Sequence, residues 1–231
     1  KYAPPTANPA MRRLPIIIVA ALAAILATIA SGAVITVFRT SFDSRGDFEA
    51  MKALSGPGDQ CKRDWRDESA LGVKTKGGPV ECAVSTPVSG DSAQPNQTVK
   101  VVAKVNKDTD DKVRETMYVG AVVRASRKEN YELRVYPKAR RFELLKSGEV
   151  LEDGREKAIE GLATKNRIEL TAQGSTITAK VNGDELASLR DKDADQVEGR
   201  QTGLSYGNAG RSKKGLGKAL FDKLKVQIPN K

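Results

Sequence analysis

Three carboxylates in the C-terminal part of the chain have the residue types and close spacing that acid–base chemistry requires. The stretch DADQVE holds Asp193, Asp195 and Glu198. Glycosidases cleave sugars with two such groups, one acting as general acid and the other as base or nucleophile. These three carboxylates lie in the polar run KDADQVEGRQ, which has the composition of a solvated loop. We therefore interpret them as turn residues and predict that the chain is not an enzyme.

The sequence lacks the residues that several other catalytic and metal-binding sites require. The 231 residues contain no histidine, which excludes catalytic triads with a histidine base and histidine-ligated zinc or haem. The stretch NKDTDDK begins like a calcium loop, but Asp111 stands where glycine is needed and Met117 where glutamate is needed. No phosphate-binding or dinucleotide-binding glycine motif is present. We expect no metal site and no cofactor.

The two cysteines, Cys61 and Cys82, are too few for a four-thiolate metal site. They form either one disulfide, in a domain outside the cytosol, or two free buried thiols. We predict the disulfide, because a lone, widely spaced pair is most simply explained by a bridge in an oxidising compartment.

Lysine and arginine give the chain a net charge of +10. Many of them gather in three clusters near expected turns. Such clusters either meet an anionic partner, such as lipid head groups, a cell-envelope polymer or an acidic protein surface, or are ordinary solubilising charge. No aromatic residues interleave with them, so we do not expect nucleic acid. The cluster residues are Arg124, Arg127, Lys128, Lys138, Arg140, Arg141, Arg211, Lys213, Lys214 and Lys218.

An uncharged apolar stretch, LPIIIVAALAAILATIASGAVITVF, occupies residues 14–38. As a helix it would be roughly 37 Å long, enough to cross a bilayer core of about 30 Å. It is longer than the apolar part of a signal peptide, which is usually about 7–15 residues. We therefore predict a single transmembrane helix here. Since Arg12 and Arg13 precede it, we place the N-terminus in the cytoplasm and the C-terminal part outside the cell membrane.

Small residues recur at every fourth position of this stretch, at Ala20, Ala24, Thr28, Gly32 and Thr36. A face of small residues lets another helix approach closely, although it can equally face lipid. If it is a contact, the partners are integral membrane proteins of a larger complex.

Four segments follow from this pattern: a cytoplasmic segment 1–13, the helix 14–38, a linker 39–60 and an outer domain 61–231. Because the chain begins with lysine, we expect further sequence before it. The outer domain contains short β-like runs that alternate apolar and polar residues between turn signals, which favours an antiparallel β-sandwich. We expect its strands at 71–75, 80–86, 98–105, 116–125, 131–137, 141–146, 166–173, 176–183, 185–191, 201–207 and 219–228.

The order of motifs in residues 95–230 resembles the concanavalin-like and laminin-G-like jelly rolls. The stretches YVGAVVRAS, NYELRVYP, GSTITAKVNG, TGLSYGN and FDKLKVQIP carry this resemblance. The positions that match are Arg124, Asn130, Tyr131, Asn182, Gly183, Gly203, Leu204, Phe221 and Asp222. The resemblance implies an all-β fold and says little about function, since such folds host lectins, hydrolases and interaction modules. Hydrolases of this fold carry Glu-x-Asp-x-x-Glu on a strand, and DADQVE departs from this at its first position.

Three functions are compatible with these observations. One helix followed by a disulfide-bearing sandwich resembles accessory subunits of the actinobacterial respiratory supercomplex of cytochrome bcc and aa3 oxidase. We therefore first expect a non-catalytic, stabilising membrane subunit. The alternatives are a membrane-tethered lectin-like module that binds cell-envelope glycans, and a divergent glycoside hydrolase. An aromatic or carboxylate-lined groove would favour the alternatives.

Overall fold

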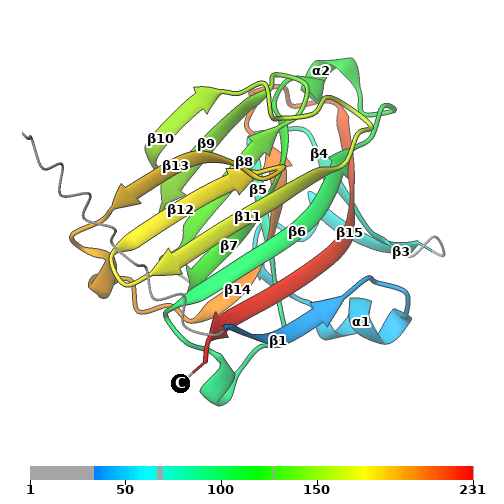
Figure 1. Ribbon diagram of the computed structural model, residues 1–231. Coiled ribbons are helices and arrows are strands. Elements are labelled where there is room, and N and C mark those ends of the chain that lie inside the picture. The colour runs from blue at the N-terminus through cyan, green and yellow to red at the C-terminus, as the bar shows by residue number, and fades with distance from the viewer. Residues whose placement is uncertain (1–33, 67–69, 127, 231) are drawn as a thin grey trace, which may run out of the picture. The chain divides into compact units, whose positions relative to one another are not determined.

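A computed structural model describes residues 34–66, 70–126 and 128–230. These residues form two antiparallel β-sheets that lie face to face (Figure 1). The predicted all-β sandwich is thereby confirmed. Among the described residues, no helix has the length and apolarity needed to span a membrane.

Sheet A, which faces the viewer in Figure 1, has the strand order β13-β12-β11-β6-β15-β4-β3. The first half of the long strand β15 pairs with β4, and its second half pairs with β1. The strands of sheet A are β1 (Val34–Thr40), β3 (Cys61–Arg66), β4 (Ala70–Lys76), β6 (Gln97–Val105), β11 (Asn166–Gln173), β12 (Thr176–Val181), β13 (Asp184–Arg190) and β15 (Leu216–Pro229).

Sheet B lies behind sheet A and has the order β10-β9-β8-β7-β14-β5-β2. Its strands are β2 (Lys52–Ser55), β5 (Val80–Ser85), β7 (Met117–Ala125), β8 (Tyr131–Tyr136), β9 (Arg141–Lys146), β10 (Glu149–Arg155) and β14 (Gln201–Asn208). The helical elements are short: α1 (Arg45–Ala50), α2 (Asp111–Arg114) and the 3-10 turns Gly90–Ser92 and Ala194–Gln196.

The core lies between the sheets and follows from alternation along each strand. In β11, Ile168, Leu170 and Ala172 are buried, as the sequence predicts, while the residues between them face outward. Facing side chains from sheet B include Leu133 and Val135 of β8. Each fully buried aliphatic side chain of this kind contributes about 1.5–3 kcal/mol of transfer free energy.

The predicted disulfide is confirmed. Cys61 of β3 and Cys82 of β5 are joined with an S–S distance of 2.01 Å. Because β3 belongs to sheet A and β5 to sheet B, the bridge ties the two sheets together.

All eleven expected strands are present, but the N-terminal boundary of the sandwich is corrected. The predicted helix 14–38 is wrong over residues 34–38, which belong to strand β1 and pair with the end of β15. The physical reason is that Val34, Ile35 and Val37 are β-branched and fit a pleated sheet better than a helix. Residues 39–60, expected as a linker, contain the end of β1, helix α1 and strand β2. The rest of the apolar stretch lies outside the described residues.

Candidate binding groove on the outer face of sheet A

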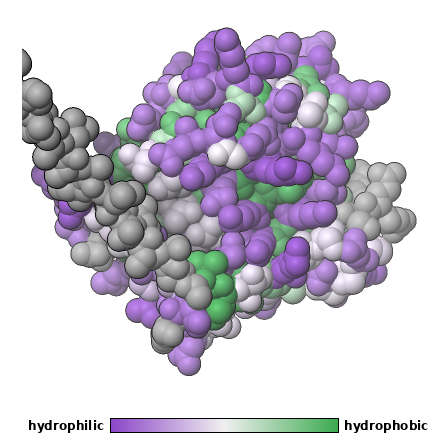
Figure 2. Space-filling view, in the orientation of Figure 1, coloured by the Kyte–Doolittle hydropathy of each residue, from purple (hydrophilic) through white to green (hydrophobic). Residues whose placement is uncertain are grey.

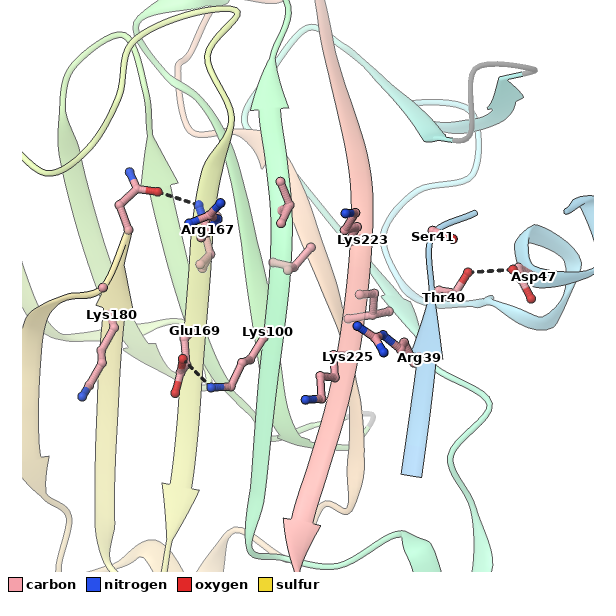
Figure 3. A pocket seen from close by; sticks show the side chains of 16 residues that line it. Arg39, Thr40, Ser41, Asp47, Lys100, Arg167, Glu169, Lys180, Lys223 and Lys225 are labelled. Atoms are coloured by element: carbon pink, nitrogen blue, oxygen red, sulfur yellow. Dashed lines mark hydrogen bonds and ion pairs between the residues drawn. The ribbon is translucent and has the colours of Figure 1, made fainter. Parts of the chain in front are cut away.

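A groove with a volume of about 690 Å³ crosses the outer face of sheet A (Figure 3). Its floor is formed by the neighbouring strands β15, β6 and β11. One wall comes from β1 and α1, and the other from β12 and the turn that follows it. The space-filling view of this face is mostly hydrophilic, with apolar surface showing at its centre (Figure 2). Because its lining residues come from five neighbouring strands, the groove runs across the strands rather than along one.

Strand alternation points the groove's charged side chains outward. In β15, Leu224 and Val226 are buried in the core, so Lys223 and Lys225 must lie on the opposite face. The same rule exposes Lys100 of β6, whose neighbours in the strand are core valines. Six cations line the groove: Arg39, Lys100, Arg167, Lys180, Lys223 and Lys225.

The strand register aligns most of these cations in one row. Arg39 of β1 pairs with Lys225 of β15, which pairs with Lys100 of β6. Lys100 then pairs with Glu169 of β11, and Glu169 pairs with Lys180 of β12. Neighbouring strands lie about 4.8 Å apart, so three cations stand side by side before the first carboxylate is reached.

The carboxylates of the groove do not balance its positive charge. Glu169 forms an ion pair with Lys100 at 2.9 Å. Asp47 accepts a hydrogen bond from the Thr40 hydroxyl at 2.8 Å, so it supports the wall formed by β1 and α1. Six cations against two carboxylates leave the lining with a net charge of +4.

Four of the six cations have no carboxylate partner among the described residues. Within the part of the chain that the structure describes, no acidic side chain lies within ion-pair distance of the four. They are Arg39, Arg167, Lys223 and Lys225.

The opposite wall is held by Asn182, which follows β12. Its side-chain oxygen accepts a hydrogen bond from the backbone N–H of Arg167 at 2.8 Å. Its side-chain nitrogen donates to the carbonyl of Ala158 at 2.7 Å and to Asn166 at 3.0 Å. Asn182 has a φ of +55°, a conformation that asparagine adopts more readily than most residues. This wall is therefore fixed by the turn and does not depend on a ligand.

The outer face of sheet B has charged and aromatic residues as well, but most of them are buried against one another. Arg134 forms ion pairs with Glu132 and Glu81, each at 2.8 Å, and its guanidinium lies 4.7 Å from the centre of the Tyr118 ring. The hydroxyl of Tyr136 donates to Glu143 at 2.5 Å. Burial raises the pKa of both tyrosines, and the neighbouring carboxylates add to the effect. This network stabilises the sheet and presents little surface to a ligand.

One predicted member of the basic surface is corrected. Arg124 is only 2% exposed, and its guanidinium donates to the backbone carbonyls of Pro95, Ala194 and Gly174 at 2.7, 3.0 and 2.6 Å. It adopts a φ of +47° at an irregularity in the pairing of β7 with β14, which turns its side chain toward these loops. Arg124 is therefore a buried clamp between loops.

The other predicted cations are divided between paired and exposed positions. Arg141 is half-buried, pairs with Glu143 and stacks on Tyr136, so it is a second correction to the predicted basic surface. Lys138 and Lys218 pair with acidic neighbours at 3.8 and 2.7 Å. Arg127 lies outside the described residues. Lys128, Arg140, Arg211, Lys213 and Lys214 are exposed on loops. None of the nine that the structure describes lines the groove.

The remaining predicted site residues that the structure describes lie outside the groove. Asp193 and Glu198 are exposed and flank the 3-10 turn Ala194–Gln196, in agreement with the turn interpretation. Of the five predicted helix-packing residues, Ala20, Ala24, Thr28 and Gly32 lie outside the described residues. Thr36 is wrong as a helix residue, because it pairs with Gln227 in sheet A.

Sequence reasoning missed the groove because its cations are scattered along the chain. A signal was present: in TVKVVAKV and FDKLKVQIP, lysines alternate with core residues, which places them on the outer face. Their assembly into one row depends on the order and register of five strands, and neither is encoded in any one segment.

Comparisons with known proteins place the chain at the level of fold. No protein-family model and no curated protein matches the sequence. Among solved structures, similar chains include a protein of unknown function with a galectin-like fold from Bacillus subtilis. It has 10% identity and a TM-score of 0.57 over 86% of this chain and 99% of its own. A laminarinase from Flavobacterium has 10% identity and a TM-score of 0.57 over 83% and 99%.

A third similar structure is arcelin-5, a lectin-like defence protein from Phaseolus vulgaris, with 7% identity and a TM-score of 0.56 over 85% of this chain and 98% of its own. The described residues therefore form a concanavalin-like, galectin-like β-sandwich, and the resemblance is confirmed for the fold. At these identities the matches carry no statement about activity. They lend no support to the predicted role in a respiratory complex.

Proposed function

We propose that this chain is a carbohydrate-binding module that holds an extended glycan across the groove of sheet A. The observation that carries the proposal is the groove itself, which has a volume of about 690 Å³ and crosses five strands. A recess of this size and direction accommodates a chain-like ligand that lies across the sheet.

The lining supplies the groups that sugar hydroxyls need. Thr40 and Asn182 are hydrogen-bonded within the protein and fix the two walls, while Ser41 adds a hydroxyl at the edge of one wall. Charged donors rise from the floor between the walls, and Val102 adds partly exposed aliphatic surface. Sugars bind in such sites through hydrogen bonds from fixed polar groups, with apolar contact beneath. The similar folds of a lectin-like protein and of a laminarinase are consistent with this proposal.

We place this module outside the cytosol, where the Cys61–Cys82 bridge can persist. The glycans within reach would then be those of the cell envelope. Secretion of the sandwich can be tested by intact-cell labelling of Lys213 and Lys214, which are exposed on a loop.

The experiment is affinity electrophoresis of the purified full chain, kept in mild detergent because of its apolar residues 14–33. Gels contain a panel of neutral and acidic polysaccharides. To localise binding, a Val102→Cys variant is labelled with a bulky maleimide that fills the groove. A Lys128→Cys variant on an exposed loop carries the same label as the matched control.

We expect at least one polysaccharide to retard the chain, and the label at position 102 to weaken that retardation at least tenfold. The same label at position 128 should leave it unchanged. If no polysaccharide retards the chain, or if both labels act equally, a glycan-binding groove is not the function.

A further inference from the structure

Building on the proposed glycan-binding function, we infer that the ligand of the groove is an acidic polysaccharide whose carboxylates are bound by the cross-strand row Arg39, Lys225 and Lys100. The register places these three cations on adjacent strands, directly opposite one another. Lys223 and Arg167 lie one step further along the same face, where both pair with Val102 of β6.

This row is unfavourable for the folded protein on its own. Like charges directly opposite in neighbouring strands destabilise a sheet. Lys100 finds Glu169, but among the described residues no carboxylate relieves the repulsion between Arg39 and Lys225. On the outer face of sheet B the arginines Arg134 and Arg141 do have carboxylate partners. Two adjacent cations in the groove, Arg39 and Lys225, with no carboxylate partner among the described residues therefore indicate a ligand that brings the negative charge.

The residues that line the groove also argue against a neutral sugar chain as its ligand. None of the sixteen described residues that line the groove is aromatic. A neutral sugar ring gains much of its affinity by stacking on an aromatic face, and this groove offers none. The strong interactions available to it are charge-assisted hydrogen bonds from lysine and arginine to anionic oxygens.

The shape of the groove favours a polymer strand over a flat anionic surface. Lys100 and Lys225 lie on the floor strands, with Thr40 and Asp47 of one wall on the β1 side (Figure 3). The wall at Asn182 lies on the opposite side, after β12. A bilayer cannot enter between two walls, whereas a single extended polysaccharide can lie across the strands and meet one cation per strand.

The test uses polygalacturonate and its fully methyl-esterified form, two polymers with the same backbone that differ in charge. The groove variant is Arg39→Gln/Lys223→Gln/Lys225→Gln. The matched control is Arg211→Gln/Lys213→Gln/Lys214→Gln, which removes the same charge from an exposed loop. Binding is measured for the full chain at several salt concentrations.

We expect polygalacturonate to bind with an affinity that falls as salt rises, and the methyl ester to bind at least tenfold more weakly. The groove variant should lose at least tenfold in affinity for polygalacturonate, and the loop variant less than twofold. The groove variant should also melt at a higher temperature than wild type in low salt, because its repulsion is relieved. This second readout shows that the variant is folded.

Three results would overturn the inference. Equal binding of both polymers would show a neutral-sugar site and leave the proposed function intact. Equal loss in the groove and loop variants would show diffuse charge attraction. Binding to anionic lipid vesicles that the groove variant abolishes, without binding to any polysaccharide, would reject the inference and the proposed function together.

Discussion

The inter-sheet disulfide allows a quantitative prediction from the structure. Opening the Cys61–Cys82 bridge releases a loop with a sequence separation of 21 residues. The chain-entropy relation gives about 3 kcal/mol of stabilisation for a loop of this length. With a urea dependence of about 2 kcal/mol per molar, the unfolding midpoint should fall by about 1.5 M on reduction.

The assay compares urea unfolding of the oxidised chain, the reduced chain and a Cys61→Ala/Cys82→Ala variant. Reduction keeps both sulfurs in place, so the oxidised and reduced curves differ by the crosslink alone. The double variant also loses the sulfur of Cys82, which is only 2% exposed, and should be slightly less stable than the reduced protein. Reducing agent should leave the double variant unchanged. A loss below about 1 kcal/mol on reduction would show that the bridge does not constrain the unfolded chain as argued.

Three further predictions concern the rest of the sandwich. Arg124→Met should cost about 3 kcal/mol in urea unfolding, because one buried and two partly buried backbone carbonyls lose their charged donor. Arg140→Met, at an exposed position of similar φ, should change stability by less than about 0.5 kcal/mol, and equal effects would refute the clamp. Gly120→Ala should sharply lower the yield of folded protein, since a Cβ there would lie 2.0 Å from the Leu133 carbonyl oxygen, and Gly161→Ala, where nothing lies within 4 Å, should be tolerated. Burial raises the pKa of Tyr206 to about 12 from the ordinary 10.0, so its contribution to stability is fully present below pH 10 and is lost as the pH rises toward 12. The part of the tyrosinate absorbance that Tyr206→Phe removes should therefore appear together with unfolding, and its appearance well before unfolding would contradict the burial argument.

The strands that the sequence predicts are those whose alternation has a single interpretation. In β11 and β6 every second residue is apolar, and a strand with one face buried is the only regular element with that period. The missed strands lack that signal. All but one of the residues of β10 are exposed, and it lies at a sheet edge, so nothing in EVLEDGR requires apolar alternation. β3 has the polar sequence CKRDWR.

The error at β1 has a different cause. Residues 34–38 continue an apolar stretch with no charge, so composition alone extends a helix through them. Their place in the sheet depends on pairing with β15, nearly two hundred residues later. Local sequence patterns cannot predict a pairing partner that lies so far away in the chain. The β-branched residues Val34, Ile35 and Val37 were the available local indication.

The two outer faces of the sandwich carry similar residue types but differ in what their charges contact, and this difference supports assigning ligand binding to sheet A. On sheet B, Arg134 reaches two carboxylates and a tyrosine ring, so a ligand would have to displace contacts that already stabilise the cation. On sheet A, Lys225 stands between two other cations, and an incoming anion displaces only water. Because a buried, paired cation is costly to expose while an unpaired, solvated one gains by pairing, anionic ligands should bind the groove in preference to the network on sheet B.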